Sequence, residues 1–341
     1  MKKTISKNVR IICCIIAMIL IIFDSGSAIN GAKEGIKLCL CTVIPSLFPY
    51  CVLSIWFRSL ISGYDLRWLR PIERFCAMPE GTGNILLLGL LGGYPIGAIC
   101  VENAVKEKQL TQTDAKYLRA ICNNAGPSFI IGIIGCVLKN KTRTFMLIFI
   151  QALSAIITNI ILSDHCATYV KRSKHKAIDL AETLTQASRC MVSVSSIIVL
   201  FRTFLSVLYK YSYQMIPNKI WALMVGFIEL TNGILLLPDL IQEEIMFIAA
   251  AGMISFGGLC TIMQTLAISS PGSGRSYVFA KSIQAFVSII LAYLYLHLHN
   301  ILLFFITYCL SWFFIILLKK KRTRRLNNIL KNSRNSVKNT V

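Results

Sequence analysis

Apolar runs of near-spanning length recur along this 341-residue chain and limit what it can fold into. A helix needs roughly 20 apolar residues to cross a bilayer. Apolar residues make up 55% of the chain and charged residues only 15%, whereas about a quarter of a typical globular chain is charged. The candidate segments are 9–23, 36–61, 84–101, 119–138, 144–162, 190–208, 220–237, 245–268, 278–297 and 300–318. We therefore predict an all-α polytopic membrane protein with short connectors.

The formal net charge of +21 could indicate nucleic-acid binding, so its location along the chain matters. The first ten residues hold four Lys and Arg without an acid, and the tail 319–341 holds nine without an acid. Basic flanks of this kind contact the anionic cytoplasmic leaflet of a membrane. The tail lacks the interleaved aromatic residues that favour nucleic-acid binding. We therefore expect membrane lipids, and not nucleic acid, as partners of the basic tail.

Two apolar segments contain residues that break or kink helices. Segment 84–101 contains Gly-Gly-Tyr-Pro-Ile-Gly at 92–97, and segment 220–237 contains Glu-Leu-Thr-Asn-Gly at 229–233. If both are re-entrant or broken helices, about eight segments cross the membrane and both termini are cytoplasmic. This topology places 27 Lys and Arg inside and seven outside, in agreement with the positive-inside rule.

The same topology gives segments two to five and segments six to nine opposite orientations, each with three crossings and one re-entrant piece. Inverted repeats of this kind occur in many secondary transporters, whose broken helices meet at a midplane binding site. The predicted divisions are a basic flank and first transmembrane helix at 1–34, a first repeat at 35–162, a basic cytoplasmic loop at 163–189, a second repeat at 190–298, a last transmembrane helix at 299–318 and a basic cytoplasmic tail at 319–341.

Polar residues inside apolar segments are costly unless they face one another or a cavity. Glu229 is the only acid in the core of a candidate segment, so we predict that it carries a proton or cation or accepts a hydrogen bond from a substrate. An ion pair between Glu229 and Arg202 is an equal alternative. The predicted substrate-binding residues are Tyr94, Pro95, Asn123, Asn124, Glu229, Thr231, Asn232 and Gln264.

Prolines and glycines in these segments predict breaks in the helical backbone. The predicted breaks are at Pro45, Pro49, Gly93, Gly97, Pro127, Gly233, Gly257 and Gly258. Structural alternatives stay open at three places. The proline pair is equally typical of a kinked span, and glycines four residues apart at 89, 93 and 97 also form a face for close helix packing. The amides at 123 and 124 could hydrogen-bond to a neighbouring helix instead of a substrate.

Motifs of soluble enzymes are missing from the sequence, which contains no HExxH, GxSxG or complete P-loop. The 13 cysteines include no CxxC pair and have no His partner at zinc spacing. We therefore predict no enzymatic activity, no metal site and no cofactor.

The motifs, taken in order, resemble those of the YlbJ-type sporulation integral membrane proteins. The resemblance covers roughly residues 35–295. It rests on Pro-Ser-Leu-Phe-Pro at 45–49, Gly-Gly-Tyr-Pro-Ile-Gly-Ala at 92–98, Asn-Asn-Ala-Gly-Pro-Ser-Phe-Ile-Ile-Gly at 123–132, Glu-Leu-Thr-Asn-Gly at 229–233 and Ser-Phe-Gly-Gly at 255–258 with Gln264. The family has Gly-Phe-Pro and Asn-Asn-Ser-Ser-Pro where this chain has Gly-Tyr-Pro and Asn-Asn-Ala-Gly-Pro. Hydroxyl contacts to a substrate are therefore not expected at Ala125 or Gly126.

The resemblance implies a multi-pass cell-membrane protein of endospore formation, within a wider group that has a nucleoside recognition or gate domain. We expect it to transport a small polar solute, nucleoside-like if the domain name is a guide, through a midplane site. The alternative is a non-transporting membrane scaffold for assembly of the spore cortex. Expected partners are the solute, membrane lipids and either a second copy of the chain or spore-assembly proteins.

Overall fold

The computed structural model describes residues 7–61, 67–76, 78–162, 179–212, 215–238, 240–269 and 274–298. Within these ranges the chain is helical, with no β-strand. Residues 1–6 of the predicted basic flank, residues 163–178 of the predicted loop, and the predicted segments 299–318 and 319–341 lie outside the described residues.

Several described helices are long and apolar enough to cross a membrane. Five qualify by length and composition: Ser25–Phe57, Lys141–Leu162, Leu180–Ser212, Glu243–Ile268 and Gly274–His297. Shorter apolar helices occur at Cys14–Phe23, Gly83–Gly92, Pro127–Leu138 and Asn218–Ile228. The chain is therefore an all-helical, multi-pass membrane protein.

The first long span begins further upstream than the sequence predicted. After α1 (Lys7–Phe23), helix α2 (Ser25–Leu38) starts where the Asp24 carboxylate accepts a hydrogen bond from the Ser27 backbone N–H at 3.3 Å. The Lys210 ammonium, 3.1 Å from that carboxylate, holds the pKa of Asp24 below its usual range by hydrogen bonding to it. A π-helical turn, Cys39–Val43, then leads without interruption into α3 (Ile44–Ile61).

The predicted breaks at Pro45 and Pro49 are therefore wrong, because both prolines lie within α3. A proline cannot donate to the carbonyl one turn earlier, which loosens the helix around it. The Ser46 hydroxyl donates to the carbonyls of Thr42 and Val43, at 2.7 and 3.1 Å, in the π-helical turn. The helix stays continuous, in line with the alternative of a kinked span.

The rest of the first half contains short helices followed by one long helix. They are α4 (Arg70–Phe75), α5 (Gly83–Gly92), α6 (Ile96–Lys106), α7 (Gln112–Ile121), α8 (Pro127–Phe129), a π-helical turn (Ile130–Ile134), α9 (Gly135–Leu138) and α10 (Lys141–Leu162). The predicted segment 84–101 is thus two helices, and the segment 119–138 is a helix interrupted at 122–126.

The second half begins with a long helix and again contains interrupted ones. Its elements are α11 (Leu180–Ser212), α12 (Asn218–Ile228), α13 (Leu230–Leu236), α14 (Glu243–Phe256), α15 (Gly258–Ile268) and α16 (Gly274–His297). The predicted segment 220–237 divides at Glu229, and 245–268 divides at Gly257.

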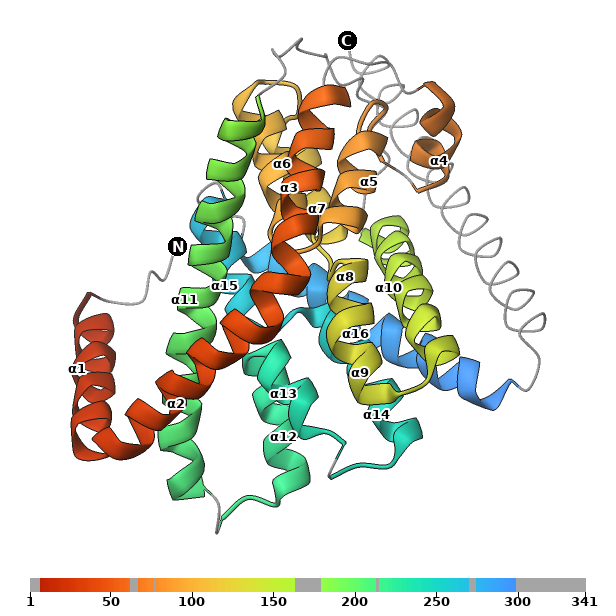
Figure 1. Cartoon of the computed structure of the whole chain (residues 1–341). Coiled ribbons are helices and arrows are strands. Elements are labelled where there is room, and N and C mark those ends of the chain that lie inside the picture. Colours follow the sequence, from red (N-terminus) through yellow and green to blue (C-terminus); the bar gives the residue numbers. More distant parts are fainter. Residues whose placement is uncertain are drawn as a thin grey trace, which may run out of the picture.

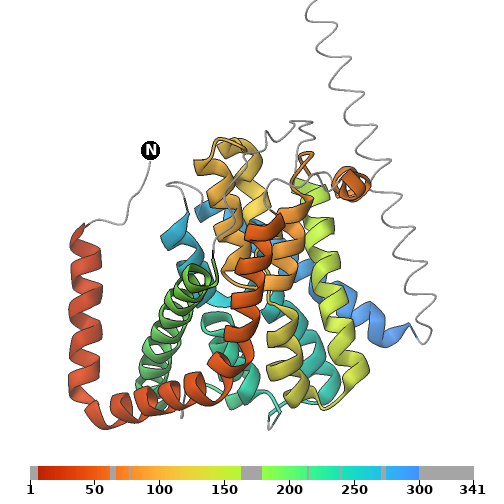
Figure 2. The same cartoon turned by 45° about the horizontal axis from the view of Figure 1, so that its top comes forward.

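The two sets of short helices approach each other from opposite ends of the molecule. In Figure 1, α5, α6 and α7 lie in the upper part and α12, α13 and α14 in the lower part, while α11 runs along one side and packs against α2 and α3. Figure 2 shows α1 standing beside this α2–α11 layer. On the other side α10 and α16 pack against each other.

Three of the short helices are about half as long as a helix that crosses a membrane. Helices α5, α6 and α12 have 10, 11 and 11 residues. At about 1.5 Å per residue each spans about 15 Å, which is half of a hydrocarbon core of about 30 Å. Each of these helices alone is therefore too short to cross a membrane.

Burial follows the pattern of a protein surrounded by lipid. Large apolar side chains such as Phe145 and Phe286 are exposed on the outside, whereas Arg119 and Lys281 are among the most buried large side chains. Arg119 of α7 forms an ion pair with Glu102 of α6, and both are almost fully buried. Glu229 is thus not the only buried acid among the described residues.

Candidate functional site

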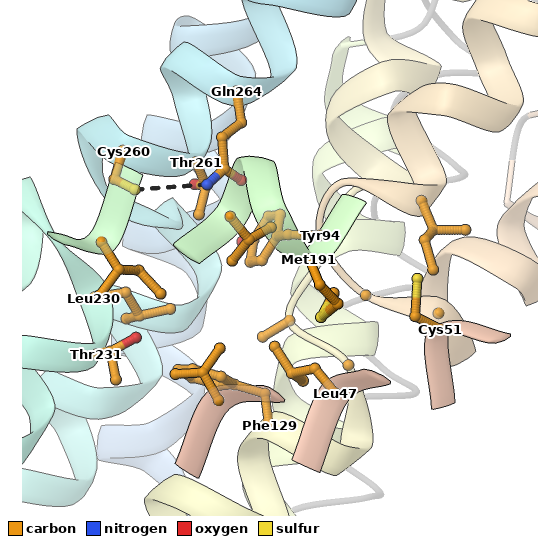
Figure 3. Close-up of a pocket in the computed structure, with 18 of the residues that line it drawn as sticks. Leu47, Cys51, Tyr94, Phe129, Met191, Leu230, Thr231, Cys260, Thr261 and Gln264 are labelled. Atoms are coloured by element: carbon orange, nitrogen blue, oxygen red, sulfur yellow. Dashed lines mark hydrogen bonds between the residues drawn. The ribbon is translucent and has the colours of Figure 1, made fainter. Parts of the chain in front are cut away.

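A cavity lies where the two sets of short helices meet. The turn between α5 and α6 and the turn between α12 and α13 both face it. The rest of its wall comes from α3 with the π-helical turn before it, α8 with the stretch 125–126 before it, α11 and α15. Figure 3 draws 18 of the lining residues and labels Leu47, Cys51, Tyr94, Phe129, Met191, Leu230, Thr231, Cys260, Thr261 and Gln264. Of the predicted substrate-binding residues, four line this cavity: Tyr94, Glu229, Thr231 and Gln264.

The cavity is small, with a volume of about 60 Å³. A buried water needs only about 10–15 Å³ of space, so the cavity has room for water but not for a large ligand. Its wall is mostly apolar, with a few polar groups from the turns and from α15. On α15 the Gln264 amide donates to the Cys260 sulfur at 3.7 Å, which is a weak bond that a better acceptor could replace.

The turn between α5 and α6, which we call the first tip, reaches across to the second half. Gly93 has a φ of +72°, which an L side chain rarely adopts, and the Tyr94–Pro95 peptide is cis. The Tyr94 hydroxyl donates to the Ile254 carbonyl near the end of α14 at 2.8 Å. The Gln151 amide of α10 donates to the same carbonyl at 3.1 Å. Tyr94 thus lines the cavity and joins the two halves.

The glycines of the first tip pack on the interrupted helix that follows. A Cβ added at Gly89 or Gly97 would overlap the Cys122 carbonyl, and one at Gly93 would meet the Gly126 backbone. The stretch 122–126 therefore passes directly over this glycine face. Close packing, which the sequence left as the alternative, accounts for Gly89 and Gly97, and Gly97 lies inside α6 rather than at a break.

Glu229 forms the turn between α12 and α13, which we call the second tip. Its backbone is extended, and its carboxylate accepts hydrogen bonds from the N–H groups of Thr231 and Asn232 at 3.1 and 2.7 Å. An acid at this position satisfies N–H groups that have no partner within the helix and stabilises the positive end of the helix dipole. Glu229 is 3% exposed and lines the cavity.

The predicted ion pair between Arg202 and Glu229 is not formed. Arg202 lies on the face of α11 that packs on α2, and its guanidinium is 2.6 Å from the Glu34 carboxylate. Glu34 lies in the part of α2 that the sequence did not assign to a span, so this partner was missed. The Glu229 carboxylate has backbone N–H donors instead.

The other predicted binding residues lie away from the cavity. Asn123 donates from its amide to Thr265 and Tyr277, at 2.8 Å each, and its own oxygen has no partner among the described residues. Asn124 bonds to Gln284 of α16 at 2.7 Å. These contacts match the alternative of helix-to-helix hydrogen bonding. Pro95 and Asn232 also do not line the cavity, although the Asn232 amide nitrogen is buried without a partner in the described part of the chain.

The remaining predicted breaks differ in kind. Gly257 and Gly258 have φ of +88° and +77° and separate α14 from α15. Pro127 is the first residue of α8, directly after the interruption at 122–126. Gly233 lies inside α13, where an added Cβ would overlap the Gly226 backbone of α12. Gly233 therefore lets α13 pack closely against α12, and the break between these helices is at Glu229.

The burial of Lys281 of α16 beside the end of α7 was not predicted from the sequence. The predicted topology includes Lys281 in the 27 Lys and Arg on the inside, but the structure places it in α16 with no exposed surface. Its ammonium donates to the Asn123 carbonyl at 2.9 Å, where α7 has just ended. A signal was present, since Lys281 lies inside the apolar run 278–297 that the sequence itself defines.

Comparison with known proteins finds a relative by sequence. The chain is 27% identical over 117 residues to the sporulation integral membrane protein YlbJ of Bacillus subtilis (strain 168). The match covers 32% of this chain and spans only 27% of that protein's length. No family model and no solved structure matches the chain. The comparison supports a YlbJ-like relationship, while the wider group with a gate domain stays a prediction.

Proposed function

We propose that this membrane protein takes part in endospore formation by moving a small polar solute through the central cavity. The observation that carries the proposal is the meeting of two helix-interrupting tips, at Tyr94 and Glu229, on one cavity between the halves of the chain. Helix ends opened at the midplane offer backbone groups and dipoles to a ligand, as in many secondary transporters. The link to sporulation rests on the similarity to the Bacillus subtilis protein.

The order of elements supports an inverted repeat. Each half has a long helix, a pair of short helices, an interrupted helix and a second long helix. The second long helix of each half, α10 or α16, contacts the interrupted helix of the other half. Gln151, eleventh in α10 when counted from 141, donates to the end of α14, and Gln284, eleventh in α16 when counted from 274, donates to Asn124 after α7.

In this proposal Glu229 accepts a hydrogen bond from the solute or carries the coupled proton or cation. Thr231, Gln264 and Tyr94 supply further polar contacts from the other walls. The present cavity of about 60 Å³ is far below the roughly 300–1,000 Å³ of pockets that hold drug-sized ligands. In this proposal the structure represents a closed state, and a nucleoside-like solute would require the two tips to separate.

A thermal-shift screen on the purified protein tests for the solute. Nucleosides, nucleobases and other polar solutes of similar size are compared, because a ligand that binds only the folded state raises the melting temperature. A true site ligand should stabilise the wild type and act much more weakly on Gln264→Leu, while Gln186→Leu on the outer part of α11 serves as the control. Uptake of that ligand into proteoliposomes then tests transport. Equal shifts in all three proteins would count against this site.

The scaffold alternative draws on one observation, which is that the cavity wall is mostly apolar and encloses little space. The two readings differ in their dependence on Glu229. Spore counts are compared in a spore-forming host that carries Glu229→Gln or the surface control Glu34→Gln in place of the native gene. Coupled transport predicts that only the Glu229 variant loses spores. Full sporulation with a folded Glu229→Gln protein would favour the scaffold.

A further inference from the structure

The ammonium group of Lys281 is surrounded by oxygen atoms. Its Nζ lies 2.8 Å from the Gln284 Oε1, 2.9 Å from the Asn123 carbonyl, 3.3 Å from the Asn124 Oδ1 and 3.5 Å from the Ala120 carbonyl. Lys281 has no exposed surface. Among the described residues no carboxylate forms an ion pair with it, so the charge is balanced by dipoles alone.

The two amide side chains are held with their oxygens toward the ammonium. The Gln284 amide nitrogen donates to the Asn124 Oδ1 at 2.7 Å, and the Asn124 amide nitrogen donates to the Ile121 carbonyl. Each amide therefore uses its nitrogen elsewhere and presents oxygen to Lys281. Outer partners that orient ligands in this way are typical of built cation sites.

The backbone carbonyls come from the end of α7. The last carbonyls of a helix lack partners within the helix and carry the negative end of its dipole, so they attract cations. In transporters with broken helices, unwound carbonyls and helix C-terminal ends coordinate the coupling cation. The Tyr94 ring, with its centroid 5.4 Å from the Lys281 Nζ, adds a face that also favours a cation.

We propose that the oxygens at the broken end of α7 form a site for a monovalent cation, and that the ammonium group of Lys281 occupies it in place of a free ion. The inference goes beyond the proposed function, since it assigns a binding site that lies behind Tyr94 and apart from the solute cavity. If the protein is a transporter, neither sodium nor potassium has to bind at this site, because the Lys281 ammonium already fills it.

Emptying the site tests this directly. Lys281→Ala removes the equivalent of propylammonium, so the purified variant is titrated with propylammonium, potassium and sodium against N-methylglucamine as the inert cation. We expect at least one of the three to raise its melting temperature saturably, by roughly 2–4 °C at ten times the Kd. The double variant Lys281→Ala/Gln284→Leu should bind about 10-fold more weakly. Wild type and Lys210→Ala, which removes a surface lysine, should not respond.

The inference is overturned if none of the three cations stabilises Lys281→Ala more than Lys210→Ala. Where Lys281→Ala gives no folded protein, cells are grown with propylamine and the folded yield is the measurement. Recovery of that yield with propylamine supports the site, and absence of recovery contradicts it. A Lys281→Met protein as stable as the wild type would also contradict it, because then only side-chain volume matters. None of these results depends on whether a solute is transported.

Discussion

The two ends of the central region carry opposite charges. At the second tip the anion Glu229 binds N–H groups at the start of α13, whereas behind the first tip the cation Lys281 binds carbonyls at the end of α7. Each charge therefore faces the helix end whose dipole stabilises it. The difference shows how a buried charge can be kept without an ion pair, because opened helix ends supply the compensating groups.

The two charges also differ in what they contact. Glu229 lines the cavity, while Lys281 is separated from it by Tyr94, which lines the cavity on one side and covers the ammonium on the other. We therefore expect Glu229 to affect function first and Lys281 to affect stability first. The variants below test this division.

The largest effect is expected from displacing the end of α7 itself. In Gly97→Ala the added Cβ overlaps the Cys122 carbonyl, so backbone must move and the oxygens around Lys281 move with it. We expect a loss of about 3 kcal/mol or more in the free energy of unfolding. Equilibrium unfolding in mixed micelles measures it. Gly132→Ala, where the Cβ would only touch Ser46 at an ordinary 3.6 Å, is the matched control and should cost little.

Removing the cation should have the next largest effect. Lys281→Met keeps most of the side-chain volume but leaves the Asn123 carbonyl and the Gln284 Oε1 without a donor. Each buried acceptor left unpaired costs about 1–3 kcal/mol, so we expect a total loss of about 3 kcal/mol. Lys210→Met, which removes a lysine whose side chain is 60% exposed, is the control and should cost less. A loss below about 1 kcal/mol for Lys281→Met would contradict the cation site at the end of α7.

Neutralising the anion should cost less stability and more function. In Glu229→Gln one amide oxygen can still accept from the start of α13, but the amide nitrogen cannot accept the second N–H. We expect a loss of about 1–2 kcal/mol in unfolding free energy, measured as above. Binding of any solute found in the thermal-shift screen should fall at least about 10-fold, which corresponds to about 1.4 kcal/mol. A variant that bound the solute normally would remove Glu229 from the site.

The sequence predicted Glu229, at the second tip, better than Lys281, behind the first tip. Glu229 stands out because an acid next to Thr, Asn and Gly interrupts an apolar run, and a break with a charge indicates a site. Lys281 is only the fourth residue of its run, where a charge ordinarily belongs to a flank. Three of its four partners come from residues about 160 positions earlier. Only tertiary packing places it under the end of α7.

Helix boundaries show the same limit. The start of α2 was missed because Lys33, Glu34 and Lys37 interrupt its apolar pattern, although it is a continuous helix with α3. Packing explains its stability there, since Gly31 and Gly35 lie directly against α11 and Arg202 pairs with Glu34. Gly93 and Gly257 mark interruptions as predicted, but Pro45, Pro49, Gly97 and Gly233 lie inside helices. The size of the cavity could not be predicted from the sequence.

The smallest effect tests whether the two ends communicate. The Ile254 carbonyl, near the end of α14, accepts from Tyr94 of the first tip and from Gln151 of α10. Tyr94→Phe or Gln151→Leu alone leaves one donor in place, so each should cost only about 0.5–1.5 kcal/mol. Together they leave the carbonyl unpaired, and the double variant should lose about 1 kcal/mol more than the sum of the two.

A double-mutant cycle on unfolding free energies measures this excess, with Tyr293→Phe on the exposed face of α16 as the control for loss of a hydroxyl. An extra loss in the double variant would show that Tyr94 and Gln151 can substitute for each other as donors to the Ile254 carbonyl. Tyr94 can do so only if the first tip is held against α14 in the folded protein. Strictly additive losses would mean that Tyr94 does not anchor the first tip to the second half. In that case the tips could separate without breaking this contact, and opening of the cavity would have to be controlled by Glu229 and its bonds to α13.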